Sequence, residues 1–231
     1  IDYWSQTYAL KRLEESRLQS QLAYESTATK LSAGMSTQAD LLSAKEAVTT
    51  AEASIVSANS SLGKTKETLC LMLGWTYGAD VEICDVPEPD LEWMESISLE
   101  SDIPLALENS YSLKILKRQI ENAVSVSNRE SLEQSYKSQR EVASNSVKNA
   151  YQNLLLARED YAQALQTYEL EKNTMDTADR KLQAGTMTRN AYEKQKSSFT
   201  TSEINVQTQK LELLRAQLDY QWAVNGLASV S

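Results

Sequence analysis

The sequence predicts an all-α protein in which two long antiparallel coiled-coil hairpins follow one another in tandem repeat. Three observations predict this fold. Helix breakers are scarce, with 6 Gly and 3 Pro in 231 residues. Apolar residues recur at alternating spacings of three and four, and one pattern occurs twice. Because Ala and straight-chain residues dominate the rest of the chain, long helices are favoured.

The first hairpin is predicted at residues 1–74, with helices over 1–33 and 38–73. Gly34 suits the position just after a helix, where φ is positive, and Gly74 ends the return helix in the same way. Thr37 and Asp40 form a capping arrangement that restarts the chain as a helix. The return helix carries a heptad seam, which predicts supercoiling: Leu41, Ala44, Val48, Ala51, Ile55, Ala58 and Leu62.

A short irregular linker is predicted at residues 75–103, because this stretch holds two of the three prolines and many acids. Residues 81–86 alternate weakly, which is compatible with one short strand. A middle helix is predicted at 104–127, with Asp102 as its cap. Pro104 falls in its early turn, where proline is tolerated.

The second hairpin is predicted at residues 129–226. Ser127 and Glu130 resemble a capping box that starts its first helix. Gly185 separates helices over 129–184 and 189–225, and Gly226 ends the second. Alanine occupies one seam position in most heptads of both hairpins. Such small residues indicate close packing of several neighbouring helices rather than a two-stranded zipper.

The two hairpins repeat each other at an offset of 151 residues. Residues 30–37 and 181–188 share the pattern Lys-Leu-x-Ala-Gly-x-x-Thr, with the glycine in register. Composition alone would not place this pattern twice at one offset. We therefore predict a duplicated unit with two equivalent turns.

Several function classes are unexpected from the composition. The net charge of −9 disfavours a nucleic-acid partner, and no window reaches the roughly 18 apolar residues of a membrane helix. The chain contains no histidine. No nucleophile–base pair, phosphate loop or metal-ligand set is evident, so we expect no enzyme activity, no cofactor and no metal.

The two cysteines, Cys70 and Cys84, leave two alternatives open. A disulfide between them would close a loop of about 15 residues and stabilise the fold by roughly 3 kcal/mol. The other alternative is a pair of unpaired, buried thiols. An oxidising compartment would favour the bridge.

The layout resembles the TolC family of outer-membrane efflux channels. The family's turn pattern, [RK]-[LY]-x-x-G-x-x-[ST]-x-x-[DE]-[LV]-L-x-A, is matched nearly throughout by residues 30–44, and residues 181–188 match its first half. Residues 104–123 resemble the family's helix after the linker. The second turn departs from the pattern, because Ala191 stands where the first has Asp40. The membrane β-strands of the family have no counterpart in this sequence.

The resemblance implies a trimeric α-helical barrel, to which each protomer contributes two hairpins. Residues 75–103 would be an equatorial-type linker. The closed tip of the barrel would dock a periplasmic-type adaptor protein and, through it, an inner-membrane pump. The docking residues that it implies are those of the two turns: Lys30, Leu31, Gly34, Met35, Ser36, Thr37, Asp40, Lys181, Leu182, Gly185, Thr186, Met187 and Thr188.

The function implied by this resemblance is an exit-duct component of a tripartite efflux or secretion system. Its location would be extracytoplasmic, in the cell envelope. The alternative is a non-conducting helical scaffold that binds another coiled coil. A further alternative, the α-hairpin of an adaptor itself, would need Gly- and Val-rich lipoyl and barrel segments, which the sequence lacks.

Overall fold

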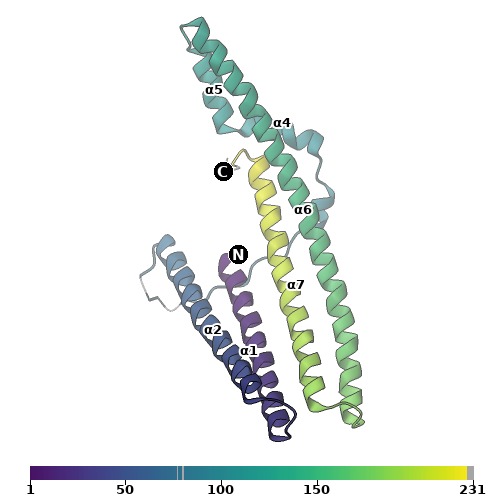
Figure 1. Ribbon diagram of the computed structural model, residues 1–231. Coiled ribbons are helices and arrows are strands. Elements are labelled where there is room, and N and C mark those ends of the chain that lie inside the picture. Colours follow the sequence, from purple (N-terminus) through teal and green to yellow (C-terminus); the bar gives the residue numbers. More distant parts are fainter. Residues whose placement is uncertain (77, 80, 228–231) are drawn as a thin grey trace. The chain divides into compact units, whose positions relative to one another are not determined.

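The computed structural model describes residues 1–76, 78–79 and 81–227 (Figure 1). Over these residues the protein has seven helices and no strand, which confirms the all-α prediction. The helices are α1 (Asp2–Ser32), α2 (Gln38–Met72), α3 (Leu91–Glu95), α4 (Leu99–Asn109), α5 (Tyr111–Glu121), α6 (Val126–Gln183) and α7 (Arg189–Val224). With 58 residues, α6 is roughly 87 Å long at 1.5 Å per residue.

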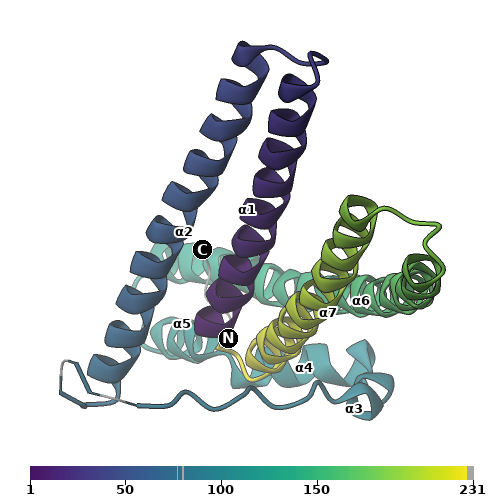
Figure 2. The same cartoon turned by 90° about the horizontal axis from the view of Figure 1, so that it is seen from below.

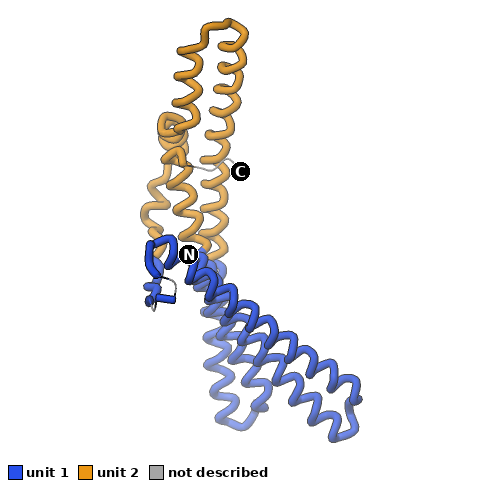
Figure 3. Tube along the Cα trace, turned by 90° about the vertical axis from the view of Figure 1, so that its left-hand side faces the viewer, with its two compact units in different colours: residues 1–86, 162–211 blue, residues 87–161, 212–231 orange. Residues whose placement is uncertain are grey.

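The chain forms two compact units that do not follow its order (Figure 3). Unit 1 contains Ile1–Val86 and Ala162–Leu211, and unit 2 contains Pro87–Tyr161 and the chain from Glu212 onward. Helices α6 and α7 therefore contribute to both units. Unit 1 combines the first hairpin with the turn end of the second. The division into four consecutive segments (two hairpins, a linker and a middle helix) stays a prediction.

Helices α1 and α2 of unit 1 run side by side as a hairpin (Figure 2), which has little core of its own. No residue of α1 is buried, and Cys70 is the buried residue of α2. Polar contacts supplement the half-buried alanine seam: Thr65 Oγ1 donates to Gln6 Oε1 at 2.9 Å, and Arg17 lies 3.9 Å from Glu52. A seam rich in Ala and Thr brings two helices together but leaves apolar surface for further neighbours.

The same terminal motif ends α1, α2, α6 and α7, as the positions of the four glycines predict. Gly34, Gly74, Gly185 and Gly226 all have φ between 69° and 75°. After α1, Gly34 N donates to Leu31 O and Met35 N donates to Lys30 O, at 2.9 and 2.8 Å. This Schellman pair satisfies carbonyls that the helix leaves open.

The described part of the linker contains no strand. Residues 81–86 run without regular pairing, so the short strand that their alternation allowed does not form. Residues 77 and 80 of the predicted linker lie outside the described residues. A period-two pattern needs a neighbouring strand to become a sheet, and the described residues supply none.

The predicted single middle helix is also wrong, because the chain breaks at Ser110 into α4 and α5. The ψ angle of Ser110 is 115°, and its hydroxyl accepts the Leu113 N–H at 3.5 Å. A Cβ placed on Gly226 would lie 2.7 Å from both Asn109 C and Ser110 N. The end of α7 thus packs directly against this break.

Two predicted caps lie inside helices instead. Helix α4 begins at Leu99, so Asp102 is within it, where its Oδ2 accepts the Tyr220 hydroxyl at 2.7 Å. Helix α6 begins at Val126, before the predicted box of Ser127 and Glu130. There Ser125 Oγ accepts the Asn128 N–H at 3.3 Å.

The core of unit 2 surrounds Tyr220, which is 1% exposed. Its ring lies 6.0 Å from those of Trp93 and Tyr151. This core joins α3 and α4 to α6 and α7. Its buried members are Met94, Ala106, Val147, Leu154, Leu213, Ala216, Tyr220 and Ala223.

Candidate functional site: the two hairpin turns

The first turn is held by a complete capping box at the start of α2. Thr37 N donates to Asp40 Oδ2 at 2.8 Å, and Asp40 N donates to Thr37 Oγ1 at 3.1 Å. Two further hydroxyls donate to the same carboxylate oxygen: Thr37 Oγ1 at 2.8 Å and Ser36 Oγ at 3.0 Å. The box replaces backbone partners that the first turn of a helix lacks.

These donors also set the charge of the turn. The backbone N–H of Thr37, followed by the hydroxyls of Thr37 and Ser36, lowers the pKa of the exposed Asp40 carboxyl below its usual value. Asp40 is therefore ionised at neutral pH and lies near the positive end of the α2 dipole. The first turn therefore carries an ionised carboxylate at Asp40 and an exposed apolar side chain at Met35, which is 73% exposed.

The second turn has the same helix end but a different helix start. Gly185 N donates to Leu182 O at 3.0 Å and Thr186 N donates to Lys181 O at 2.9 Å, as after α1. At the start of α7, Thr188 Oγ1 accepts the Ala191 N–H at 3.3 Å. Ala191 has no carboxylate to accept the backbone N–H of Thr188, so only half of the capping box is present. The second turn therefore lacks the negative charge that Asp40 gives the first.

The structure places both turns at the same end of unit 1 (Figure 1). All thirteen residues that the resemblance implies for docking are at least partly accessible. Their helices begin and end within a few residues of each glycine, so backbone geometry fixes where the exposed side chains lie. The structure thus gives a pair of exposed, similarly capped turns, and docking at them stays a prediction.

Sequence reasoning missed further features of the second turn. A hydrogen bond to Asp179 is the main cause that raises the pKa of the Tyr192 hydroxyl, and Arg189 lies 3.8 Å from Glu193. Asn190 Oδ1 is buried without a hydrogen-bond partner in the described structure. The Tyr192 contact joins α7 to α6 across the turn, which a pattern along one helix does not reveal.

Neither cysteine is bonded in the structure. Cys70 is 2% exposed and Cys84 is exposed, and both are free thiols. Of the two thiols, only that of Cys70 is buried, and the disulfide between Cys70 and Cys84 stays a prediction. Cys84 lies in the linker near the start of α1, where the Trp4 indole Nε1 donates to its carbonyl oxygen at 3.0 Å.

The described residues contain no group of three side chains of the types that hold metal ions. Within the same part of the chain, we find no helix with both the length and the apolar character that crossing a membrane requires.

Comparison with known proteins gives structural but no sequence matches. No family model and no curated protein matches the chain. The solved structure of CusC, a protein that forms a transmembrane channel, is similar with a TM-score of 0.61 and 16% identity. The similarity covers 98% of this chain and 75% of CusC.

Two further structures are similar over almost the whole chain. The outer-membrane channel OprN matches with a TM-score of 0.51 and 14% identity, over 96% of this chain and 62% of OprN. The outer membrane protein VceC of Vibrio cholerae matches with 0.52 and 11%, over 99% of this chain and 70% of VceC. The chain therefore has the helical fold of TolC-family outer-membrane channels, as its turn motifs predict.

Proposed function

We propose that this protein is a subunit of a TolC-like exit duct in a tripartite efflux or secretion system. Its hairpins would form part of an α-helical barrel, and its turns would dock an adaptor protein. The observation that carries the proposal is the fold, which three outer-membrane proteins share over at least 96% of this chain. The accessible pair of turns at one end of unit 1 supports the docking role.

The poorly buried first hairpin supports assembly into a barrel. Helix α1 has no buried residue, and α2 exposes Leu42 and Val56, which are two heptads apart. Neighbouring helices would cover these side chains, and cyclic symmetry would cover every copy without leaving an open edge. A homotrimer with two hairpins per protomer is the assembly that we propose.

The first turn presents both an apolar and a charged side chain, which supports reversible docking. Met35 offers a flexible apolar contact, and Asp40 of the same turn carries a negative charge. Through the adaptor, the duct would meet an inner-membrane pump, and the complex would lie in the cell envelope outside the cytoplasm.

Site-specific photo-crosslinking in cells tests this proposal. A crosslinking residue is placed at Met35 and, separately, at Thr186, both of which are exposed and outside the glycine positions. We expect both to give a product that mass spectrometry identifies as the chain joined to one adaptor protein. The same residue at Ser57, an exposed position in the middle of α2, is the matched control and should give no adaptor product.

The outcome separates the duct from a non-conducting scaffold. Crosslinks from both turns to a different coiled-coil protein, with unchanged export by cells that lack this chain, would favour the scaffold. Crosslinks from neither turn, in a protein that is folded and expressed, would remove the docking role.

A further inference from the structure

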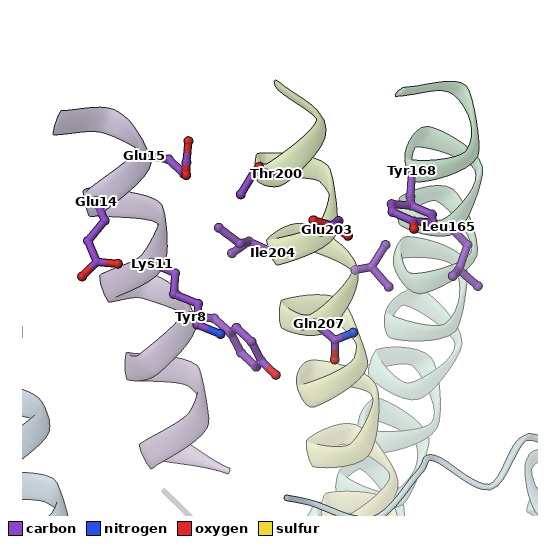
Figure 4. A pocket seen from close by; sticks show the side chains of 11 residues that line it. Tyr8, Lys11, Glu14, Glu15, Leu165, Tyr168, Thr200, Glu203, Ile204 and Gln207 are labelled. Carbon is purple, nitrogen blue, oxygen red and sulfur yellow. The ribbon is translucent and has the colours of Figure 1, made fainter. Parts of the chain in front are cut away.

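A groove of about 660 Å³ lies within unit 1, bordered by α1, α6 and α7 (Figure 4). Its volume falls within the roughly 300–1,000 Å³ that is typical of small-molecule sites. Figure 4 shows Tyr8 extending from α1 towards α7, and Ile204 extending from α7 towards α1. The groove therefore has walls from three helices.

The groove offers apolar and aromatic surface. Ile204, which is 6% exposed, extends from α7 towards α1, and Leu165 of α6 lines the groove from the other side of α7 and is partly exposed. Tyr8 and Tyr168 add two aromatic rings to the lining. The Tyr168 ring stacks on Phe199 with 5.5 Å between centroids, so its position is fixed by packing. Aromatic faces attract cations as well as apolar groups.

The charged residues of the groove are mostly acidic. Three carboxylates, those of Glu14, Glu15 and Glu203, line it with the single ammonium of Lys11, which leaves a net charge of −2. Lys11 Nζ lies 5.2 Å from the centroid of the Tyr8 ring.

One of these carboxylates, that of Glu15, already has a hydrogen-bond partner, because the Ser197 hydroxyl donates to its Oε2 at 2.9 Å. Within the described residues, Glu14 and Glu203 have neither a hydrogen-bond nor an ion-pair partner for their side chains. They extend from α1 and α7, so a cation in the groove would have a carboxylate on each of two walls.

We propose that this groove binds a monovalent organic cation with an apolar body. The body packs between Tyr8 and Ile204, and the charge faces the carboxylates that line the groove, among them Glu14 and Glu203. An anion of the same shape meets the same apolar surface but an unfavourable potential, so charge decides which of the two binds. This binding needs neither an adaptor nor a ring of subunits, and the purified chain is sufficient to measure it.

The test compares two ions of nearly equal size and shape and opposite charge. Isothermal titration calorimetry of the purified chain with tetraphenylphosphonium should show saturable binding with a Kd on the order of 100 µM. Tetraphenylborate should bind at least about tenfold more weakly, and added salt should weaken phosphonium binding. Equal affinity for the two ions, or no phosphonium binding below about 1 mM, would overturn the proposal.

Variants localise the binding to the groove. Glu14→Gln with Glu203→Gln should weaken phosphonium binding about tenfold, and Lys11→Gln should strengthen it about threefold, since exposed charge pairs are worth a few-fold each. Glu169→Gln, at an exposed position of α6 outside the groove, should leave it unchanged. Gln has nearly the same helix propensity as Glu, so circular dichroism should not change. Unchanged affinity in the double variant would exclude this groove as the site.

Discussion

Gln217 of α7 holds the backbone of Asp90 with both ends of its side-chain amide. Its Nε2 donates to the Asp90 carbonyl oxygen at 2.7 Å, and its Oε1 accepts the Asp90 N–H at 3.2 Å. Gln217 is buried. The Asp90 side chain in turn accepts the Trp93 N–H at 2.9 Å and starts α3. One side chain of α7 thereby fixes the linker as a strand would, without any sheet.

We expect Gln217→Leu to destabilise unit 2 by about 2 kcal/mol, because it leaves a backbone donor and a backbone acceptor without partners. Thermal and urea unfolding would measure the loss. Gln221→Leu, one turn further along α7 and exposed, is the control and should change stability by less than about 0.5 kcal/mol. Equal effects of the two substitutions would show that the amide contributes little.

Tyr220 should make the stability of the protein fall at high pH. Burial, followed by the hydrogen bond to Asp102, raises the pKa of its hydroxyl well above the ordinary value. The unfolded chain therefore ionises first as pH rises. The stabilisation is complete below about pH 10 and is lost as pH rises towards the folded-state pKa.

The Tyr220→Phe variant tests this dependence. The ring contacts stay, but the hydroxyl that titrates is gone, so the fall in stability above about pH 10 should be smaller than in the wild type. At neutral pH the variant should lose about 1 kcal/mol with the hydrogen bond. Denaturation followed from pH 7 to pH 11 measures both effects, and parallel pH profiles would contradict the assignment.

Removing the acid of the first turn and adding one to the second should change the protection of the following helix in opposite directions. Asp40→Ala removes the acceptor of three donors, so amides at the start of α2 should lose protection from hydrogen exchange. Ala191→Asp supplies an acceptor for Thr188 and should increase protection at the start of α7. Because the pKa of Asp40 is lowered, its stabilisation is present at neutral pH and is lost as pH falls below about 4.

Measurements at two pH values distinguish the effect of the ionised carboxylate from the effect of a change in helix propensity. Hydrogen exchange at pH 7 should show the loss in Asp40→Ala and the gain in Ala191→Asp. Circular dichroism melts at about pH 2.5 should show a smaller difference from the wild type in both variants. A difference that persists unchanged in acid would mean that the charged box is not its cause.

The sequence predicted the elements whose signals are local. Four glycines marked four helix ends because each must adopt positive φ, and the Thr37–Asp40 box needs only neighbouring residues. The break at Ser110 escaped prediction because no strong breaker marks it and its partner, Gly226, is distant in sequence. The groove was not predicted for a related reason. Its walls come from α1, α6 and α7, and the heptad pattern of one helix does not show which other helices pack against it.

Gly226→Ala should be far more disruptive than the same change at another helix-ending glycine. A Cβ at position 226 would lie 2.7 Å from the backbone at Asn109 and Ser110, where no side-chain rotation relieves the overlap. Gly74 has a similar φ of 75°, but nothing lies within 4 Å of its Cβ position. Gly74→Ala should therefore cost roughly 1 kcal/mol, the strain of positive φ alone. Gly226→Ala adds the overlap and should cost upwards of about 2 kcal/mol. Thermal unfolding of the two variants, with circular dichroism before heating, measures the difference. Equal losses would show that α7 does not approach the α4–α5 break this closely.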